Sequence, residues 1–188
     1  MRLFVAVVPP DDVRAALTSI QDALTRAGGD VKWVEPENIH VTLKFLGEVT
    51  VERAAEVRAA LCTIAAPAFV MGTGDTGAFP PRGKPRVVWI GLEDSGPLVA
   101  LQAAVERVLQ PLGFPGEDRP FAPHLTVGRV RSPKGVEGLQ NAIRDTRAAR
   151  QQWAVQSFTL MESRLSTRGP TYLHVEDFPL GEPARAPR

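Results

Sequence analysis

The chain has 188 residues, of which 44% are hydrophobic and 23% are charged, which suits a domain with a buried core and excludes a largely disordered protein. The formal net charge of +1 excludes the long-range basic field of a duplex nucleic-acid binder, so an anionic ligand has to be captured locally. The single cysteine excludes an intrachain disulfide, and the lack of an apolar run near the ~20 residues that span a bilayer argues against a membrane partner, so we expect a cytoplasmic protein.

Strands and helices alternate along the first half of the chain. The apolar run at 3–8 predicts a strand, and a helix ending before Gly28 is predicted by four apolar residues at helical spacing, Val13, Leu17, Ile20 and Leu24. The stretch NIHVTLKFLGE then predicts a strand at 39–46. It precedes a helix whose apolar face carries Val57, Leu61 and Ile64, and a further strand fits 68–72.

The same order returns after the stretch GTGDTGAFPPRGKPR, whose glycines and prolines predict a mobile connection at mid-chain. RVVWIGL predicts a strand, FAPHLTVGRV predicts a second motif strand, and two further strands are predicted in AVQSFTLMESRL and TYLHVEDF. Between them lie two amphipathic helices, one on Leu98, Leu101, Val105, Val108 and Leu112, the other on Val136, Leu139 and Ile143. We therefore expect an α+β fold of two similar lobes that face each other.

Both predicted motif strands carry the pattern histidine, apolar, threonine, apolar, beginning at His40 and His124. Side chains alternate between the faces of a strand, so His40 shares a face with Thr42, and His124 shares one with Thr126. A single copy would be typical of a structural histidine, but the chain has only three histidines and two of them occur in this pattern. We predict that both lobes present these side chains to one central cleft.

Two imidazoles and two hydroxyls in one cleft favour phosphoryl chemistry. One histidine can take a proton from water while the other protonates a leaving alkoxide, and threonine hydroxyls can donate to phosphate oxygens. Such a pair suits an activated substrate such as a strained cyclic phosphate. The sequence has no H-E-x-x-H, G-x-S-x-G or P-loop pattern and no carboxylate cluster beside these histidines, so we expect neither a metal nor a cofactor.

The chain resembles the two-histidine phosphoesterases, and within them the RNA 2′,3′-cyclic phosphodiesterases, also called 2′-5′ RNA ligases. The resemblance rests on four stretches spread over nearly the whole chain: RLFVAVVPP, VKWVEPENIHVTLKFLGEV, FAPHLTVGRV and LMESRLSTRGPTYLHVEDFPL. It implies a bilobal domain at 1–180, with lobes of roughly 1–78 and 85–180, antiparallel-rich sheets, some exchanged strands and a pseudo-twofold axis. A flexible tail would follow at 181–188.

The resemblance also implies the reaction, in which a 2′,3′-cyclic phosphate end of RNA or of a nucleotide is opened to a 2′-phosphate without a metal. It implies that His40 is the general acid and His124 the general base, although the residue types alone leave the two roles interchangeable. We expect a monomer. Two alternatives stay open from the sequence: RNA joining by the reverse reaction, and a non-catalytic module that binds RNA 3′ ends.

Two further residues of the motif strands are candidate ligands. Arg129 matches the H-x-T-x-x-R extension of the family and could bind phosphate, but strict alternation places it on the core face unless a bulge occurs at Gly128. Lys44 shares the parity of His40, so it could reach the edge of the cleft, where a solvated lysine is the alternative. Phe45 has the opposite parity, so strict alternation places it in the core.

The remaining candidates lie outside the motifs. Trp33 could stack on a base or anchor the surface of the protein, and Arg82 and Lys84 in the mid-chain stretch could attract the RNA backbone or remain solvated. His174 lacks a partner threonine, so we interpret it as structural.

Overall fold

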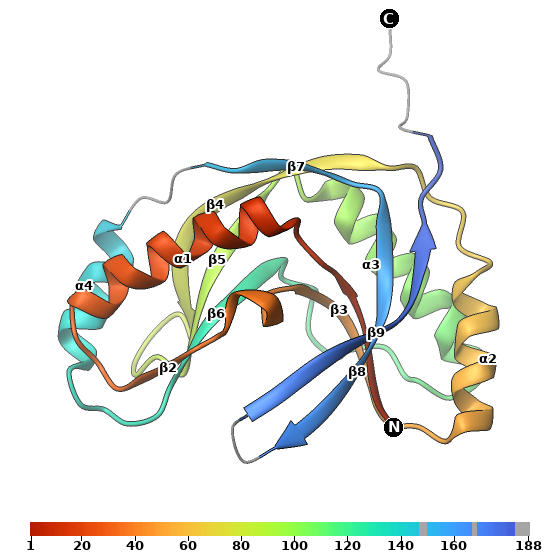
Figure 1. Ribbon diagram of the computed structural model, residues 1–188, viewed down its shortest axis with the longest axis horizontal. Coiled ribbons are helices and arrows are strands. Elements are labelled where there is room, and N and C mark those ends of the chain that lie inside the picture. Colours follow the sequence, from red (N-terminus) through yellow and green to blue (C-terminus); the bar gives the residue numbers. More distant parts are fainter. Residues whose placement is uncertain (147–149, 167–168, 183–188) are drawn as a thin grey trace, which may run out of the picture.

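Two antiparallel sheets organise the computed structural model, which describes residues 1–146, 150–166 and 169–182 (Figure 1). The first sheet has the strand order β3-β1-β8-β9, and the second has the order β2-β6-β5-β4-β7. The strands are β1 (Arg2–Val7), β2 (Val31–Trp33), β3 (Val41–Glu48), β4 (Phe69–Phe79), β5 (Val87–Glu93), β6 (His124–Val130), β7 (Gln152–Val155), β8 (Ser157–Ser166) and β9 (Gly169–Pro179).

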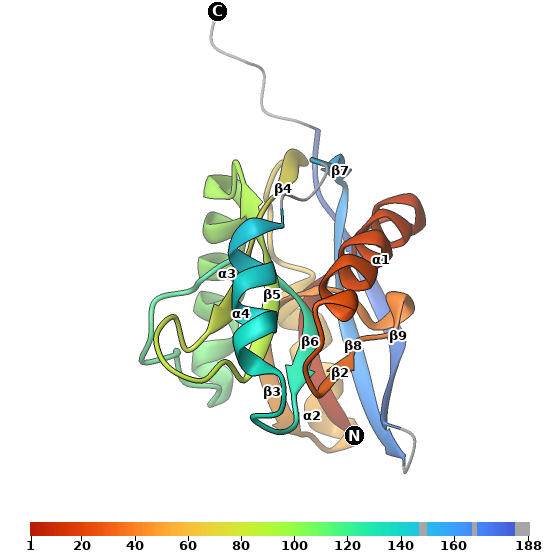
Figure 2. The same cartoon turned by 90° about the vertical axis from the view of Figure 1, so that its left-hand side faces the viewer.

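The helices form where the apolar periodicity predicts them: α1 (Asp11–Arg26), α2 (Val51–Leu61), α3 (Gly96–Leu109) and α4 (Val136–Asp145), with short 3-10 helices η1 (Pro36–Asn38) and η2 (Gln110–Leu112). Acidic Asp11 and Asp12 open α1, where they complement the helix dipole, and the Thr50 hydroxyl accepts the Arg53 N–H at 3.2 Å to cap α2. Helices α1 and α4 contact each other, as do α2 and α3 (Figures 1 and 2). Within the described residues, no helix is long and apolar enough to cross a membrane.

The halves of the sequence exchange strands. β2 and β4 from the first half lie in the second sheet, while β8 and β9 from the end of the chain complete the first sheet. One continuous apolar core, which includes Leu17, Leu43, Leu125 and Phe158, joins both sheets and all four helices. The expected bilobal α+β architecture is confirmed, and its two sheets share a single core.

The mid-chain stretch is more regular than its composition predicts. β4 continues through Gly72 and Gly74 to Phe79, so only 80–86 form the connection to β5. At Gly77 a side chain is excluded, because an added Cβ would lie 2.2 Å from Cη2 of Trp89. Gly77 marks a close approach within a strand, where the composition predicts a loop.

The first residue of the predicted tail, Gly181, is ordered by backbone hydrogen bonds. Gly181 is held by two backbone hydrogen bonds of 2.9 Å, one donated by Ala68 and one accepted by Ala66. Residues 183–188 of the predicted tail lie outside the described residues.

A β-bulge follows the threonine of the first motif and reverses the alternation of β3. Ala6 pairs with Thr42 but Val5 pairs with Lys44, so Leu43 is the extra residue. Lys44 is therefore buried at 3% exposure, whereas Phe45 is 64% exposed on the face that carries Thr42. The predictions that Lys44 faces the cleft and that Phe45 faces the core are both wrong, because strict alternation of side chains does not continue through a bulge.

The Lys44 ammonium group binds acceptors inside the protein. Its Nζ donates to both carboxylate oxygens of Glu106 on α3 at 2.9 Å and to the Pro115 carbonyl at 2.7 Å. The predicted contact between Lys44 and substrate is therefore contradicted. The ion pair instead fastens the first motif strand to α3 and to the segment that leads to the second motif.

The second motif strand carries a bulge at the equivalent place. Trp89 pairs with Thr126 and Val88 pairs with Gly128, which leaves Val127 as the extra residue. The Val127 carbonyl accepts two hydrogen bonds, from Nε2 of buried Gln21 on α1 at 2.9 Å and from the Val34 N–H at 3.0 Å. A buried side chain from a helix thus fixes each bulge, Gln21 at β6 and Glu106, through Lys44, at β3.

The buried ion pair predicts a specific pattern of stability. Lys44→Met should lower the free energy of unfolding by about 3–5 kcal/mol, because it leaves the Glu106 carboxylate without its positive partner and the Pro115 carbonyl without the Lys44 donor. The double variant Lys44→Met, Glu106→Leu should recover much of this loss, since an apolar pair avoids the unpaired charge. Urea unfolding followed by circular dichroism measures both; a single variant as stable as the wild type would contradict the assignment.

Candidate active site

Both motif histidines are held by the same backbone contact. Nδ1 of His40 lies 2.8 Å from the Asn38 carbonyl, and Nδ1 of His124 lies 2.7 Å from the Ala122 carbonyl, in each case two residues earlier in the chain. A carbonyl only accepts hydrogen bonds, so Nδ1 carries the proton in both rings. Each neutral imidazole therefore presents Nε2 as an acceptor, which becomes a donor after protonation.

An aromatic ring from another strand supports each imidazole edge to face. Tyr172 on β9 contacts His40 at a centroid distance of 5.1 Å and an interplanar angle of 88°. Phe79 on β4 contacts His124 at 5.1 Å and 83°. A second aromatic ring lies near each histidine: the centroid of Phe4 is 4.9 Å from that of His40, and the centroid of Trp89 is 6.5 Å from that of His124. The two halves thus repeat the geometry around each histidine as well as the motif itself.

The two histidines and Arg129 are electrostatically coupled. Burial lowers the pKa of His40 from 6.5 to about 4, against the hydrogen bond to the Asn38 carbonyl, which raises it. The positive charges of Arg129 and His124 lower this pKa further. His40 is therefore neutral near pH 7. The strand that follows His40, β3, contacts β6, which begins at His124.

The face of each sheet that carries its histidine, here called the histidine face, also carries the motif threonine. Thr42 and Thr126 are half-buried, and neither hydroxyl has a hydrogen-bond partner in the described part of the chain. Because of the bulge at Val127, exposed Arg129 lies on the histidine face of the second sheet. Phe45 occupies the corresponding place on the first sheet, five residues after its histidine.

The other predicted residues make none of these contacts with the motif histidines. Trp33 pairs with Gly128 and packs on the core side of β6, opposite the face of Arg129, so a base-stacking role there is contradicted. Arg82 and Lys84 are exposed in the connection between β4 and β5. His174 is exposed on β9, with Nδ1 3.6 Å from Oδ1 of Asp177.

Sequence reasoning missed the aromatic residues of the site. Tyr172, Phe79 and Trp89 lie in strands that pair only through long-range topology, and no local pattern assigns them to a histidine. Phe45 was detectable in principle, since its place relative to His40 matches that of Arg129 relative to His124.

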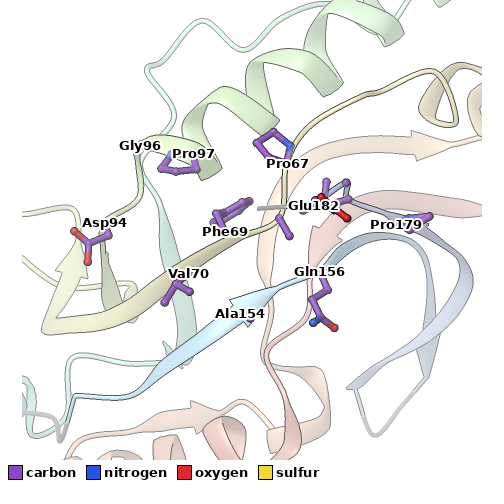
Figure 3. A pocket seen from close by; sticks show the side chains of 13 residues that line it. Pro67, Phe69, Val70, Asp94, Gly96, Pro97, Ala154, Gln156, Pro179 and Glu182 are labelled. Carbon is purple, nitrogen blue, oxygen red and sulfur yellow. The ribbon is translucent and has the colours of Figure 1, made fainter. Parts of the chain in front are cut away.

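A separate apolar groove of about 1000 Å³ lies at the far end of the second sheet, and neither motif histidine lines it (Figure 3). Its walls come from β4, β7, the start of α3 and the residues after β9, with Phe69 and Pro97 prominent in the view. In the described part of the chain, no three histidine, cysteine, aspartate or glutamate side chains gather where they could hold a metal ion together.

Comparison with known proteins identifies the same repeat. The family model "LigT like Phosphoesterase" matches the chain twice, at residues 7–89 and 90–172. A protein of Archaeoglobus fulgidus named RNA 2′,3′-cyclic phosphodiesterase is 40% identical over 178 residues, which cover 95% of this chain and 99% of that protein.

Two solved structures have the same fold. A protein of Thermus thermophilus superposes with a TM-score of 0.77 at 34% identity, covering 97% of this chain and 99% of that one. Escherichia coli LigT in complex with 3′-AMP superposes with a TM-score of 0.76 at 25% identity, covering 95% and 97%. The chain, with its two matched repeats and one histidine motif in each, belongs to the LigT-like phosphoesterase family.

Proposed function

We propose that the protein hydrolyses 2′,3′-cyclic phosphate ends of RNA or of nucleotides to 2′-phosphates, using two histidines and no metal. The observation that carries the proposal is the pair of imidazoles held in the same tautomer, each with Nε2 left for substrate. The name of the Archaeoglobus relative and the 3′-AMP bound to Escherichia coli LigT support the reaction and the ligand class.

In the proposed mechanism His124 is the general base and His40 the general acid. Nε2 of His124 takes a proton from a water molecule, whose oxygen forms the new bond to phosphorus. The bond from phosphorus to O3′ breaks, and Nε2 of protonated His40 donates a proton to that oxygen. The products are a 2′-phosphate monoester and a free 3′-hydroxyl.

Thr42, Thr126 and Arg129 are the proposed phosphate ligands. The two threonine hydroxyls have no other partner in the described residues, and each lies on the histidine face of its own sheet. Donors from both sides can orient the phosphate and stabilise the charge that spreads over its oxygens during attack. Arg129 adds a permanent positive charge.

The bound phosphate also explains how His40 can act as an acid. Its pKa of about 4 leaves it neutral in the free protein, partly because Arg129 is positive. An anionic substrate offsets that charge, which raises the pKa of His40 and favours the protonated form in the complex.

Phe45 is the proposed contact for the terminal base. Its ring is 64% exposed and lies 6.1 Å from that of Phe4, which in turn contacts His40. A flat exposed ring beside a nucleotide site can stack on any base, because every base offers a π face.

Removing either histidine tests the two-catalyst mechanism. His40→Ala and His124→Ala should each lower kcat on a 2′,3′-cyclic nucleotide by about 10²–10⁴-fold, the usual contribution of one acid or base. Product analysis in the presence of a chelator, with circular dichroism to verify folding, makes the measurement. Near wild-type turnover in one folded variant contradicts the two-catalyst mechanism. A 3′-phosphate product or joined RNA from the wild type contradicts the proposed reaction. Binding by the wild type without any product identifies a non-catalytic module.

A change of leaving group separates the acid from the base. p-Nitrophenolate leaves without a proton, so on bis(p-nitrophenyl) phosphate His40→Ala should retain activity within about tenfold of the wild type, whereas His124→Ala should stay about 10²–10⁴-fold impaired. The absorbance of the released p-nitrophenolate measures the rate of this reaction directly. The opposite order of the two variants would reverse the assigned roles.

The low pKa of His40 predicts a pH dependence. The folded protein holds His40 neutral, so this group contributes stability above pH 6.5 that is lost as pH falls toward about 4. NMR titration should give His40 a midpoint near 4, and Arg129→Gln should move it to higher pH by removing a positive charge. Arg107→Gln on α3 is the control; equal midpoints in wild type and Arg129→Gln would contradict the coupling.

A further inference from the structure

The connection between β4 and β5, residues 80–86, begins and ends at the histidine site. Phe79, which precedes it, places its ring 5.1 Å from that of His124. Val87, which follows it, pairs directly with Arg129 on β6. A short chain segment therefore leaves one wall of the site and returns to it.

This loop is basic and carries no acidic residue. Its sequence is PPRGKPR, in which Arg82, Lys84 and Arg86 are all exposed. None of the three forms a salt bridge in the described part of the chain, although the protein as a whole has a net charge of only +1. Three exposed cations therefore lie within five residues of one another, in a loop that ends next to the partner of Arg129 on β5.

Hydrogen bonds hold the loop in place. At its tip, the Gly83 carbonyl accepts a bond of 2.8 Å from Nε2 of Gln140 on α4. At its end, the Arg86 carbonyl accepts a bond of 2.9 Å from the Val130 N–H. The three cations thus project from a segment that is anchored to the second sheet and to α4.

We propose that this loop binds the RNA backbone on the 5′ side of the reacting end, so that the preferred substrate is an oligoribonucleotide. The inference rests on the proposed function and adds a substrate class to it. Arg82 and Lys84 are each three residues from a strand end at the site, a span of at most ~11 Å. Phosphates of the last few nucleotides would lie within their reach when the cyclic end is at the histidines.

Continuity with the site favours RNA over an acidic protein segment. An RNA strand whose terminal phosphate lies between the histidines carries a further phosphate at every nucleotide. The loop would therefore contact negative charge on a molecule that is already bound. An acidic peptide has no group that needs the histidines. Single-stranded nucleic acid is bound by this kind of short basic surface, and the binding depends strongly on salt.

The test compares two substrates with the same reacting end: uridine 2′,3′-cyclic phosphate and an oligouridylate that ends in it. At low salt kcat/KM should be at least about tenfold higher for the oligonucleotide than for the mononucleotide. If the loop makes two phosphate contacts, the ratio of these two kcat/KM values should fall about sevenfold when the salt concentration is raised fourfold. The variant Arg82→Gln, Lys84→Gln, Arg86→Gln should reduce the ratio toward one. The control Arg2→Gln, Arg26→Gln, Arg107→Gln removes the same three charges elsewhere and should preserve the ratio.

The outcomes separate the two proposals. If neither substrate is hydrolysed, the proposed function fails. If both are hydrolysed with equal kcat/KM at all salt concentrations, the function stands and the RNA-binding loop is overturned. A ratio that falls equally in both triple variants also overturns the loop, because net charge would then explain the preference.

Discussion

One extra residue in each motif strand decides which side chains the two histidine faces present. Without the bulge at Val127, Arg129 would lie in the core among the residues that Trp33 now contacts, and without the bulge at Leu43 the core would have to accept Phe45 in place of Lys44. The bulges are fixed from outside their own sheets. Gln21 satisfies the Val127 carbonyl, and Glu106 neutralises Lys44. The geometry of the site thus depends on helix packing, because the same buried polar contacts position the helices and fix the bulges.

The two halves repeat their geometry but not their chemistry. Both imidazoles donate Nδ1–H to the carbonyl two residues earlier, and both lie edge to face with an aromatic ring at 5.1 Å. The fifth residue after each histidine differs, since Phe45 is apolar and Arg129 is charged. A symmetric scaffold thereby acquires an apolar side and a cationic side, as an asymmetric nucleotide requires.

The sequence predicts the parts of this structure that depend on local periodicity. The four helices and the pairing of each histidine with its threonine follow from spacings that neighbouring residues determine. The sequence misplaces Lys44 and Phe45 and leaves two alternatives open for Trp33, because the orientation of these residues depends on a bulge or on a partner strand far away in sequence. The course of β4 was missed because its glycines indicate a loop locally, whereas Gly77 is required by the Trp89 indole packed against it.

The charge arrangement explains how a nearly neutral protein could hold an anion without a permanently charged pair of histidines. Desolvation and Arg129 keep His40 neutral when the site is free, so the cost of a partly buried imidazolium is avoided. An anion that raises the pKa of His40 must, by linkage, bind more tightly to its protonated form. Substrate binding and proton uptake would then be the same event, and the proton would reach the site together with the bond that it helps to break.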